Sequence, residues 1–451
     1  MFYSVSLPYV NDASGYFSAI ADLPWAAWLD SAGRGRYDIL CAQPFVSLLT
    51  RGETTRVQDE GGVQCLAGDP FDLLRQQLGN WREQIADVPF AGGALGYWGY
   101  DLARCYGTLP VQPPAEVPEM AVAIYDWALV IDHQAKTCKL VSLKRHKATE
   151  AMLPDILARL QRGSTNEAAK FEVLGKIVSI PDGDDYRKAF EKVQGYLHAG
   201  DCYQVNLARR FTAQASGSAL AAYHELRRLS PAPYSAFLDF PGIQVLSASP
   251  ECFLKVRNGT VETRPIKGTR PRMKDEQQDE QMVRDLREHA KDRAENLMIV
   301  DLLRNDLGKG CMPGSIRVTR LFEVESYATV HHLVSTVTGR LAAGRDALTV
   351  MRDCFPGGSI TGAPKQRAME IIAELEPGQR GVYCGAIGYV GFDGSMDTNI
   401  AIRTMTYAEG KICFWAGGGI VADSGMASEY QETGDKARAM LEMLQHFGGS
   451  L

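Results

Sequence analysis

The sequence has little of what marks secreted, membrane or nucleic-acid-binding proteins. Its ten cysteines are scattered, and none forms a Cys-x-x-Cys pair or has a histidine at zinc-finger spacing, so we expect reduced thiols. No apolar run approaches the about 18 residues of a membrane span, and residues 1–30 lack a secretory signal pattern. The net charge of −6 argues against a general nucleic-acid binder, which needs a basic face. We therefore expect a cytoplasmic, soluble protein.

What the chain of 451 residues does have is the composition of an ordinary globular enzyme, with 45% apolar and 23% charged residues. Short apolar or alternating runs predict strands in the first 145 residues, at 37–40, 45–49 and 120–125. Segment 92–100 packs glycines against aromatics, which is typical of a strand that another backbone approaches closely. Residues 146–170 predict a helix, and residues 163–183 predict a connection.

The rest of the chain mixes long helices with strands. One helix is predicted to begin after a cap at Asp184 or Asp185 and to end at Gly200. Helical or strand periodicity continues to the C-terminus, with helices over 275–307, 366–374 and 427–447 and strands over 202–211, 384–391, 398–405 and 411–416. Because helices and strands cluster rather than alternate, we favour an α+β fold over a doubly wound sheet.

Two of these helices carry carboxylates at matched spacing. Asp292 and Glu295 are three residues apart and share a helix face. Glu429 and Glu432 repeat the spacing on the last helix, with Lys436 one turn further on. If the two faces met across a cleft, their oxygens would suit a hard cation such as Mg²⁺. The residues alone describe two solvated helix faces equally well.

Glycine-rich segments and a histidine pair add further candidates. Residues 357–365 precede a helix, so their amides could bind an anion, although they do not match a Walker loop. Residues 417–419 are three glycines whose amides could meet a carboxylate. Either segment could also be a tight turn. His332 could be an acid, a base, a positioned donor or a satisfied core residue.

The segment Pro265-Ile266-Lys267-Gly268-Thr269 holds a lysine between an extended dipeptide and a glycine turn. A lysine held at a strand end near an acid such as Glu251 can act as a nucleophile. On local context alone it can equally be a solvated charge.

Taken together, the motifs resemble those of a known family. Segments 295–306, 358–365, 416–421 and 429–433 occur in the order and spacing of the chorismate-utilising enzymes, which include anthranilate synthase component I and the isochorismate and salicylate synthases. The resemblance implies an anthranilate synthase component I-like fold, with two packed, mainly antiparallel sheets surrounded by helices. It also implies an N-terminal region over 1–160 and a chorismate-binding region over 184–447, both parts of one globule.

Within the family, residues 265–269 are similar to the signature of the branch that aminates chorismate at C4. Anthranilate synthases usually have alanine at position 267, and isochorismate-type members have a water-activating lysine where this chain has Gln204. The implied activity is Mg²⁺-dependent amination of chorismate to 4-amino-4-deoxychorismate, for p-aminobenzoate and folate biosynthesis, through a covalent Lys267 adduct. The alternatives are anthranilate synthase component I and a non-catalytic tryptophan-binding relative.

The resemblance also implies roles for individual residues. Lys267, with a lowered pKa, would be the nucleophile and Glu251 would protonate the leaving hydroxyl, while His332 and Ser359 lie near the ring. The family's Mg²⁺ site maps onto Glu295 and Glu432, with Glu429 and Asp292 in or near its shell. The substrate-binding positions of the family map onto Gly417, Gly418, Gly419 and Lys436 for the ring carboxylate, and onto Tyr389 and Arg403 for the enolpyruvyl carboxylate.

A partner and a second ligand follow from the same resemblance. No Gly-x-Cys-x-Gly nucleophile elbow occurs in the sequence, so ammonia would come from a separate glutamine amidotransferase subunit, the second component of a heterodimer. The family's tryptophan pocket resembles a set of residues around two loops, namely Ser31, Arg36, Tyr37, Pro233, Tyr234 and Ser235. The pocket could equally be a hydrophobic core seam, and the loop 33–37 departs from the family's usual one.

Overall fold

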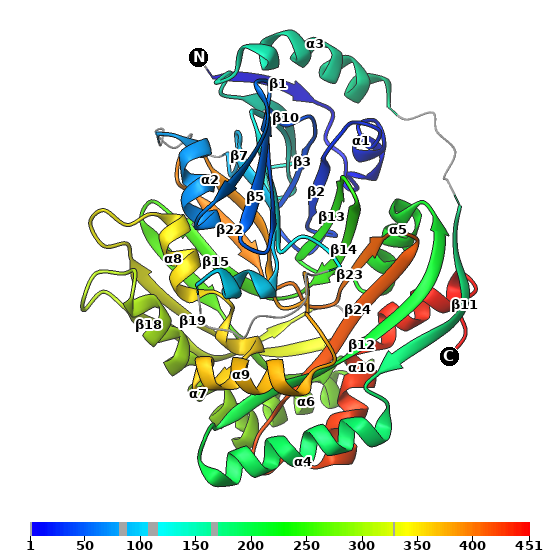
Figure 1. Cartoon of the computed structure of the whole chain (residues 1–451), viewed down its shortest axis with the longest axis vertical. Coiled ribbons are helices and arrows are strands. Elements are labelled where there is room, and N and C mark those ends of the chain that lie inside the picture. Colours follow the sequence, from blue (N-terminus) through cyan, green and yellow to red (C-terminus); the bar gives the residue numbers. More distant parts are fainter. Residues whose placement is uncertain (1, 81–87, 107–115, 164–169, 328–329) are drawn as a thin grey trace.

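Two large antiparallel sheets, each of 12 strands, form the centre of the protein (Figure 1). A computed structural model describes residues 2–80, 88–106, 116–163, 170–327 and 330–451. Helices α3, α4 and α10 lie on the outside of the sheets in Figure 1. This arrangement confirms the predicted α+β fold.

The first sheet draws strands from both ends of the chain. Its strands are, in spatial order, β1 (Tyr3–Leu7), β10 (Thr137–Ser142), β9 (Trp127–Asp132), β3 (Tyr37–Cys41), β2 (Ala26–Asp30), β13 (Tyr234–Phe240), β14 (Ile243–Ser249), β23 (Thr404–Ala408), β24 (Lys411–Ile420), β12 (Gln204–Gly217) and β11 (Phe171–Ile180), with β20 (Gly362–Ala363) beside β12.

The second sheet is built in the same way. It runs through β17 (Ile266–Pro271), β19 (Val330–Arg340), β16 (Thr260–Arg264), β15 (Cys252–Arg257), β22 (Met396–Asn399), β21 (Ala386–Gly391), β7 (Gly93–Trp98), β8 (Met120–Tyr125), β4 (Val46–Arg51), β5 (Thr54–Asp59) and β6 (Gly62–Ala67), with β18 (Arg317–Ser326) beside β19.

The helices of the described part cover the sheets, and α7 and α10 carry the carboxylate motifs. They are α1 (Ser14–Ser18), α2 (Pro70–Leu78), α3 (Lys147–Arg162), α4 (Gly183–Ala199), α5 (Ala219–Leu229), α6 (Glu276–Glu288), α7 (Ala290–Gly308), α8 (Ala347–Cys354), α9 (Lys365–Leu375) and α10 (Met426–His446), with 3-10 turns η1 (Tyr100–Tyr106) and η2 (Gly358–Ile360). None of them is long and apolar enough to cross a membrane.

The core between the sheets takes side chains from strands of both. Tyr97 and Tyr125 of the second sheet pack there with Leu238 and Val245 of the first, and all four are 0% exposed. The glycine-rich strand β7 fits this crowded layer as predicted, because a Cβ on Gly96 would lie 2.1 Å from a carbonyl oxygen of the neighbouring strand β8. The two predicted sequence regions share both sheets, since β2 pairs with β13 and β7 pairs with β21.

Several predicted boundaries are wrong. The N-cap of α4 is Asp182, whose side chain accepts hydrogen bonds from the amides of Asp184 and Asp185. The long helix predicted over 275–307 is divided at His289, which ends α6 and caps α7. Residues 171–180 form strand β11 rather than a connection, while 164–169 lie outside the described residues.

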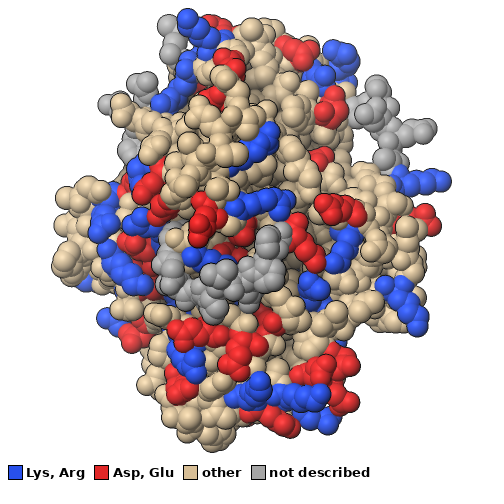
Figure 2. Space-filling view, in the orientation of Figure 1, with Lys and Arg blue, Asp and Glu red and all other residues tan. Residues whose placement is uncertain are grey.

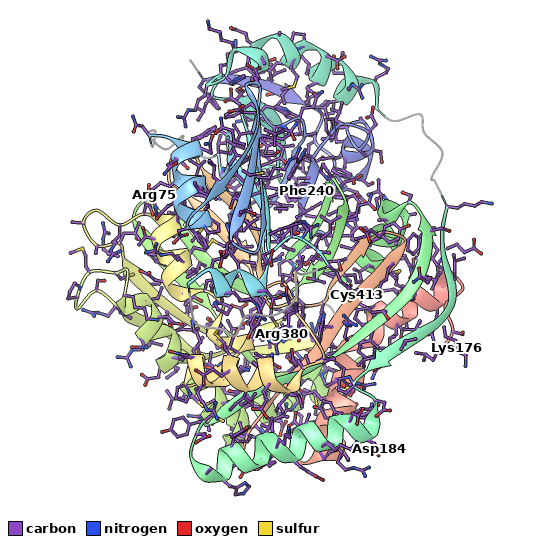
Figure 3. All side chains as sticks on the ribbon, viewed as in Figure 1. Arg75, Lys176, Asp184, Phe240, Arg380 and Cys413 are labelled. Carbon is purple, nitrogen blue, oxygen red and sulfur yellow. The ribbon has the colours of Figure 1, made fainter. Side chains whose placement is uncertain are left out.

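Two strand predictions near the C-terminus are also wrong. The segment 398–405 is divided between β22 and β23, and Arg403 lies in the break with a φ of 49°. The glycines at 417–419 lie inside β24 rather than after it. Figure 3 shows Cys413, on β24, and Arg380 near the middle of the molecule. On the face shown in Figure 2, basic and acidic side chains are interspersed.

A carboxylate-rich candidate active site

Lys267 lies on β17, at the edge of the second sheet, where the chain needs a glycine directly after it. Gly268 has a φ of 84°, and a Cβ there would lie 2.9 Å from Asp292 and from Leu286. A side chain is therefore excluded by backbone conformation and by contact with α6 and α7. The amide of Ser335 on β19 donates to Pro265 O, which fixes the start of the strand. The Lys-Gly pair thus places an amine against the carboxylate-bearing face of α7.

The amine of Lys267 is paired with a carboxylate instead of being free. Its Nζ lies 2.8 Å from Glu295 Oε1 and donates to Ser359 O at 3.2 Å, and the side chain is only 13% exposed. Desolvation alone would lower the pKa of Lys267, but attraction to Glu295, Glu251 and Glu432 outweighs it and raises the pKa above its ordinary value. The expectation of a lowered pKa is therefore wrong for the protein without ligands. It counted the effect of a nearby cation on the amine but not the attraction of the nearby carboxylates.

Glu251 lies after β14 and faces the same space from the other side. It is 5% exposed, and burial raises the pKa of its carboxyl even though the Ser359 side chain and Lys267 favour the ionised form. A buried carboxyl with a raised pKa keeps its proton more readily than a surface one. Glu251 therefore has the protonation behaviour of a general acid, and Ser359 links it to the loop that also contacts Lys267.

Three of the four predicted metal ligands lie around β24. A Cβ on Gly418 would be 3.1 Å from Glu429 Oε2 and 3.3 Å from Glu432 Oε1, and one on Gly419 would be 3.3 Å from Glu295 Oε1. Glycines are therefore needed for the carboxylates to approach the strand. Among the described residues no group of three ligands is close enough to hold a metal ion.

The carboxylates are held apart by partners of their own. Lys436 lies 2.7 Å from Glu432 and donates to Gly417 O at 3.0 Å, so the predicted substrate-binding amine is paired with a predicted metal ligand. Asp292 is not with the other three: it pairs with Arg270 at 3.1 Å and with His289 at 2.9 Å.

The donor set nevertheless fits a hard cation. Glu295, Glu429 and Glu432 offer only carboxylate oxygens, the ligand type that Mg²⁺ prefers. Glu429 Oε2 is buried and has no hydrogen-bond partner among the residues described. A buried, unpartnered carboxylate oxygen is costly and is the atom that a cation would satisfy.

The glycine segment of β24 exposes backbone amides at a free strand edge. On the neighbouring strand β12, the amides of Asn206 and Ala208 bond to groups outside the β12–β24 pair. Hydrogen-bonded pairs alternate along an antiparallel ladder, so the pair between these two positions, Leu207 and Gly418, is the bonded one. The amides on either side of Gly418 in β24 therefore point away from β12. Among the described strands, β23 pairs with β24 only as far as Phe414. Gly417 and Gly419 are therefore the better candidates for binding a carboxylate.

His332 and Arg403 line one wall of a cavity of about 370 Å³. Arg403 is half-buried, and among the described residues no carboxylate pairs with it. His332 Nδ1 lies 2.9 Å from Thr269 Oγ1, and burial, with Arg403 and His331 nearby, lowers the pKa of the imidazole to about 4. The wall thus offers a guanidinium and a neutral imidazole. Lys436 and Arg34 line the same cavity.

Tyr389 does not join this wall. Its ring packs between the sheets against Phe90, with ring centroids 5.0 Å apart, and the side chain is 7% exposed. The alternation of β21 explains this, since Ile387 and Tyr389 share the face that enters the core. Tyr389 therefore lies apart from the cavity lined by Arg403, its predicted companion for the enolpyruvyl carboxylate.

The residues of the predicted tryptophan pocket do lie close to one another. A Cβ on Gly35 would be 3.1 Å from Ser31 Cβ and 3.3 Å from Pro233 O, so the two loops touch. Ser31 Oγ is buried without a hydrogen-bond partner among the described residues, whereas the Tyr37 hydroxyl lies beside the Arg257 guanidinium. The others are engaged: Arg36 pairs with Asp132 at 2.8 Å, Tyr234 O accepts from Asn399 and Ser235 Oγ donates to Ala232 O.

Sequence reasoning missed residues that support this site. Ser424 donates to Glu429, Thr269 bonds to His332 and Gln204 donates to Glu295 Oε1 at 3.1 Å. Arg34, in the loop 33–37, lines the cavity of Arg403. Of these residues, Thr269 lies inside the motif 265–269, and Gln204 is the position at which isochorismate-type members have a lysine. Ser424 has no local signal, because a serine in a turn is ordinary.

Comparison with known proteins identifies the family. The model of the chorismate binding enzyme family matches residues 26–442. Aminodeoxychorismate synthase component 1 of Klebsiella aerogenes is 48% identical, and that of Escherichia coli strain K12 is 46% identical, each over 98% of both chains. The crystal structure of anthranilate synthase component I from Streptococcus pneumoniae is 33% identical, covers 90% of this chain and 92% of its own, and has a TM-score of 0.80. The chain belongs to the family of chorismate binding enzymes.

Proposed function

We propose that the chain aminates chorismate at C4 to give 4-amino-4-deoxychorismate, the activity named in its relatives at 45–48% identity. The observation that carries the proposal is Lys267, held 2.8 Å from Glu295 and facing the buried acid Glu251. An amine at this point can add to the ring, which a ring-facing alanine could not do.

The reaction is written as two displacements. Neutral Lys267 Nζ bonds to C2, the two ring double bonds shift, and the C4–O bond breaks as Glu251 gives its proton to the leaving hydroxyl, which departs as water. Ammonia then bonds to C4, the double bonds shift back and the C2–N bond breaks. One proton passes from the new ammonium to Glu251, so that both catalytic groups return to their starting state. Two displacements place nitrogen at C4, where one would place it at C2.

Binding groups follow from the charges of the cavity. Arg403 is suited to bind one carboxylate of chorismate through two parallel hydrogen bonds. Neutral His332 is positioned by Thr269 and can donate from Nε2 to the substrate. The amides of Gly417 and Gly419 would bind the ring carboxylate.

Glu295, Glu432 and Glu429 would hold a divalent cation such as Mg²⁺. Such a cation would supply positive charge that offsets the repulsion between these carboxylates and a dicarboxylate substrate. With Glu295 engaged as a ligand, Lys267 would lose part of the attraction that raises its pKa, which would favour the neutral amine that the first displacement needs.

We also propose that the ammonia comes from a glutamine amidotransferase partner, because the relatives are named component 1, which implies a second component. The pocket around Ser31 would bind tryptophan, and the buried, unpartnered hydroxyl of Ser31 supports a polar ligand there. Calorimetric titration of the wild type and of Ser31→Ala with tryptophan tests this, since the variant should bind more weakly.

The deciding experiment is product analysis with chorismate, Mg²⁺ and ammonium. Wild type should form 4-amino-4-deoxychorismate, Lys267→Ala should not, and Lys176→Ala, on an exposed edge of the sheet (Figure 3), should behave as wild type. Anthranilate from the variant alone would assign the position of amination to Lys267. Anthranilate from the wild type would favour the function named in the anthranilate synthase component I relatives, such as those at 42% and 33% identity. No turnover in either protein would favour a binding protein without catalysis.

A further inference from the structure

A short turn joins the glycine strand β24 to helix α10, and Ser424 closes it. The amide of Ser424 donates to Val421 O at 2.9 Å, and the amide of Val421 donates to Ser424 Oγ at 3.1 Å. These two bonds bring both ends of the turn together. The turn therefore sets the distance between the strand that offers backbone amides and the helix that carries Glu429.

The hydroxyl of Ser424 has a second partner. Because Ser424 Oγ accepts from an amide, its own hydrogen is free to donate, and it donates to Glu429 Oε1 at 2.6 Å. This short bond fixes one of the two carboxylate oxygens. The other, Oε2, lies toward Gly418 and has no hydrogen-bond partner among the residues described. Glu429 is only 5% exposed, so Oε2 is shielded from bulk solvent, and a ligand there would satisfy a buried oxygen.

The turn is itself held from outside by helix α4. Gln194 Nε2 donates to Val421 O at 3.0 Å and reaches Ser424 O at 3.4 Å. Ser424 therefore cannot shift without breaking contacts on two helices. Its hydroxyl is fixed before any ligand arrives, which is the condition under which one hydrogen bond can orient a carboxylate.

We propose that Ser424 is a positioning residue that holds Glu429 Oε1 so that Oε2 faces a divalent cation shared with Glu432. The inference rests on the proposed function, in which these carboxylates hold the cation. Groups that bond to a metal-binding side chain typically change metal affinity by about 10–100-fold when they are removed. Ser424 does not touch substrate in this assignment and acts only through Glu429.

The test is direct metal binding by the full-length protein without substrate. Mn²⁺ would be titrated and its free fraction followed by electron paramagnetic resonance, with Mg²⁺ competing. Ser424→Ala should bind about 10–100-fold more weakly, while Ser424→Thr, which keeps the hydroxyl, should bind within a few-fold of wild type. Ser428→Ala is the matched control: Ser428 lies in the first turn of α10, and its hydroxyl donates to Gly425 O rather than to Glu429. It should bind as wild type does.

Glu429→Gln separates the two ways in which the inference can fail. If Glu429→Gln binds weakly and Ser424→Ala binds as wild type, the cation site stands and the role of Ser424 is refuted. If neither variant changes Mn²⁺ binding, Glu429 is not a ligand, and both the inference and this part of the proposed function fail. Equal weakening in Ser424→Ala and Ser424→Thr, with unchanged thermal unfolding, would also refute a role for the hydroxyl.

Discussion

Acid should destabilise the protein through His332, and His332→Asn should remove that effect. The imidazole is 4% exposed, and burial, together with Arg403 and His331, lowers its pKa to about 4 from the ordinary 6.5. The folded state therefore binds a proton less readily than the unfolded state. Stability falls as the pH drops below 6.5 and stops falling once the pH passes the folded pKa of about 4.

The size of the effect follows from linkage between proton binding and unfolding. A change in pKa from 6.5 to about 4 corresponds to about 3 kcal/mol over the whole range. Between pH 7 and pH 5 the same relation gives a loss of about 2 kcal/mol in the free energy of unfolding. This is a large share of the about 5–15 kcal/mol typical of folded proteins.

Urea unfolding at pH 7 and pH 5 measures the effect. Wild type should lose about 2 kcal/mol more than His332→Asn over this interval. His198→Asn is the matched control, because His198 is exposed on α4, and its loss should equal that of wild type. Equal pH dependence in wild type and His332→Asn would refute the account, and so would a histidine spectrum in which all eight imidazoles titrate near 6.5.

Three further outcomes follow. Bonding to Asp38 raises the pKa of His133 to about 9. The protonated imidazole therefore stabilises the folded state fully below pH 6.5, and this contribution is lost as the pH rises through 9. In urea unfolding, His133→Asn should be less stable than wild type by up to about 3 kcal/mol at pH 6 and equal to it at pH 10. Arg380→Met should lose about 3–5 kcal/mol in urea unfolding, because it leaves Glu376, whose side chain is 1% exposed, without its cation; a loss under 1 kcal/mol would contradict this. Arg34→Gln should lower kcat/KM several-fold at low ionic strength and leave kcat unchanged, because Arg34 lines the cavity and would attract an anionic substrate. Arg340→Gln is the control, since Arg340 lies at the far end of β19 from His332. The same fall in kcat/KM for Arg340→Gln would show that the effect is not local to the cavity.

The sequence predicts the fold class and most helices because periodicity and capping are local. It fails where long-range contacts decide. A helix predicted to run without a break to Leu307 is divided at His289, where that side chain accepts a hydrogen bond from the amide of Asp292. Arg403 interrupts a predicted strand in a left-handed conformation that no neighbouring residue signals. The glycines at 417–419 indicate a turn locally, yet the pairing with β12 makes them strand.

Site residues were found through motifs rather than through local chemistry. Glu251, Glu295 and Lys267 do come together, although 44 sequence positions separate the two acids, and a motif match was needed to relate them. Residue type alone could not show which way the side chain of Tyr389 points. A shift of one residue in strand register decides whether an aromatic side chain faces the core or a cavity. Ser424 could not be found at all, since its role depends on the orientation of a turn.

Counting charges around the cavity explains why these residue types occur together. Lys267 neutralises Glu295, and Lys436 neutralises Glu432. Burial raises the pKa of both Glu251 and Glu429, which favours their neutral forms. Arg403 and Arg34 are then cavity cations for which no carboxylate partner is found among the described residues, and Arg403 is suited to bind one of the two carboxylates of chorismate. If the amides of Gly417 and Gly419 bind the other carboxylate, it approaches Glu295 and Glu432, where Coulomb repulsion opposes it. We expect that a divalent cation held by these carboxylates would offset that repulsion and would weaken the hold of Glu295 on Lys267, so a single ion would serve both binding and nucleophile release.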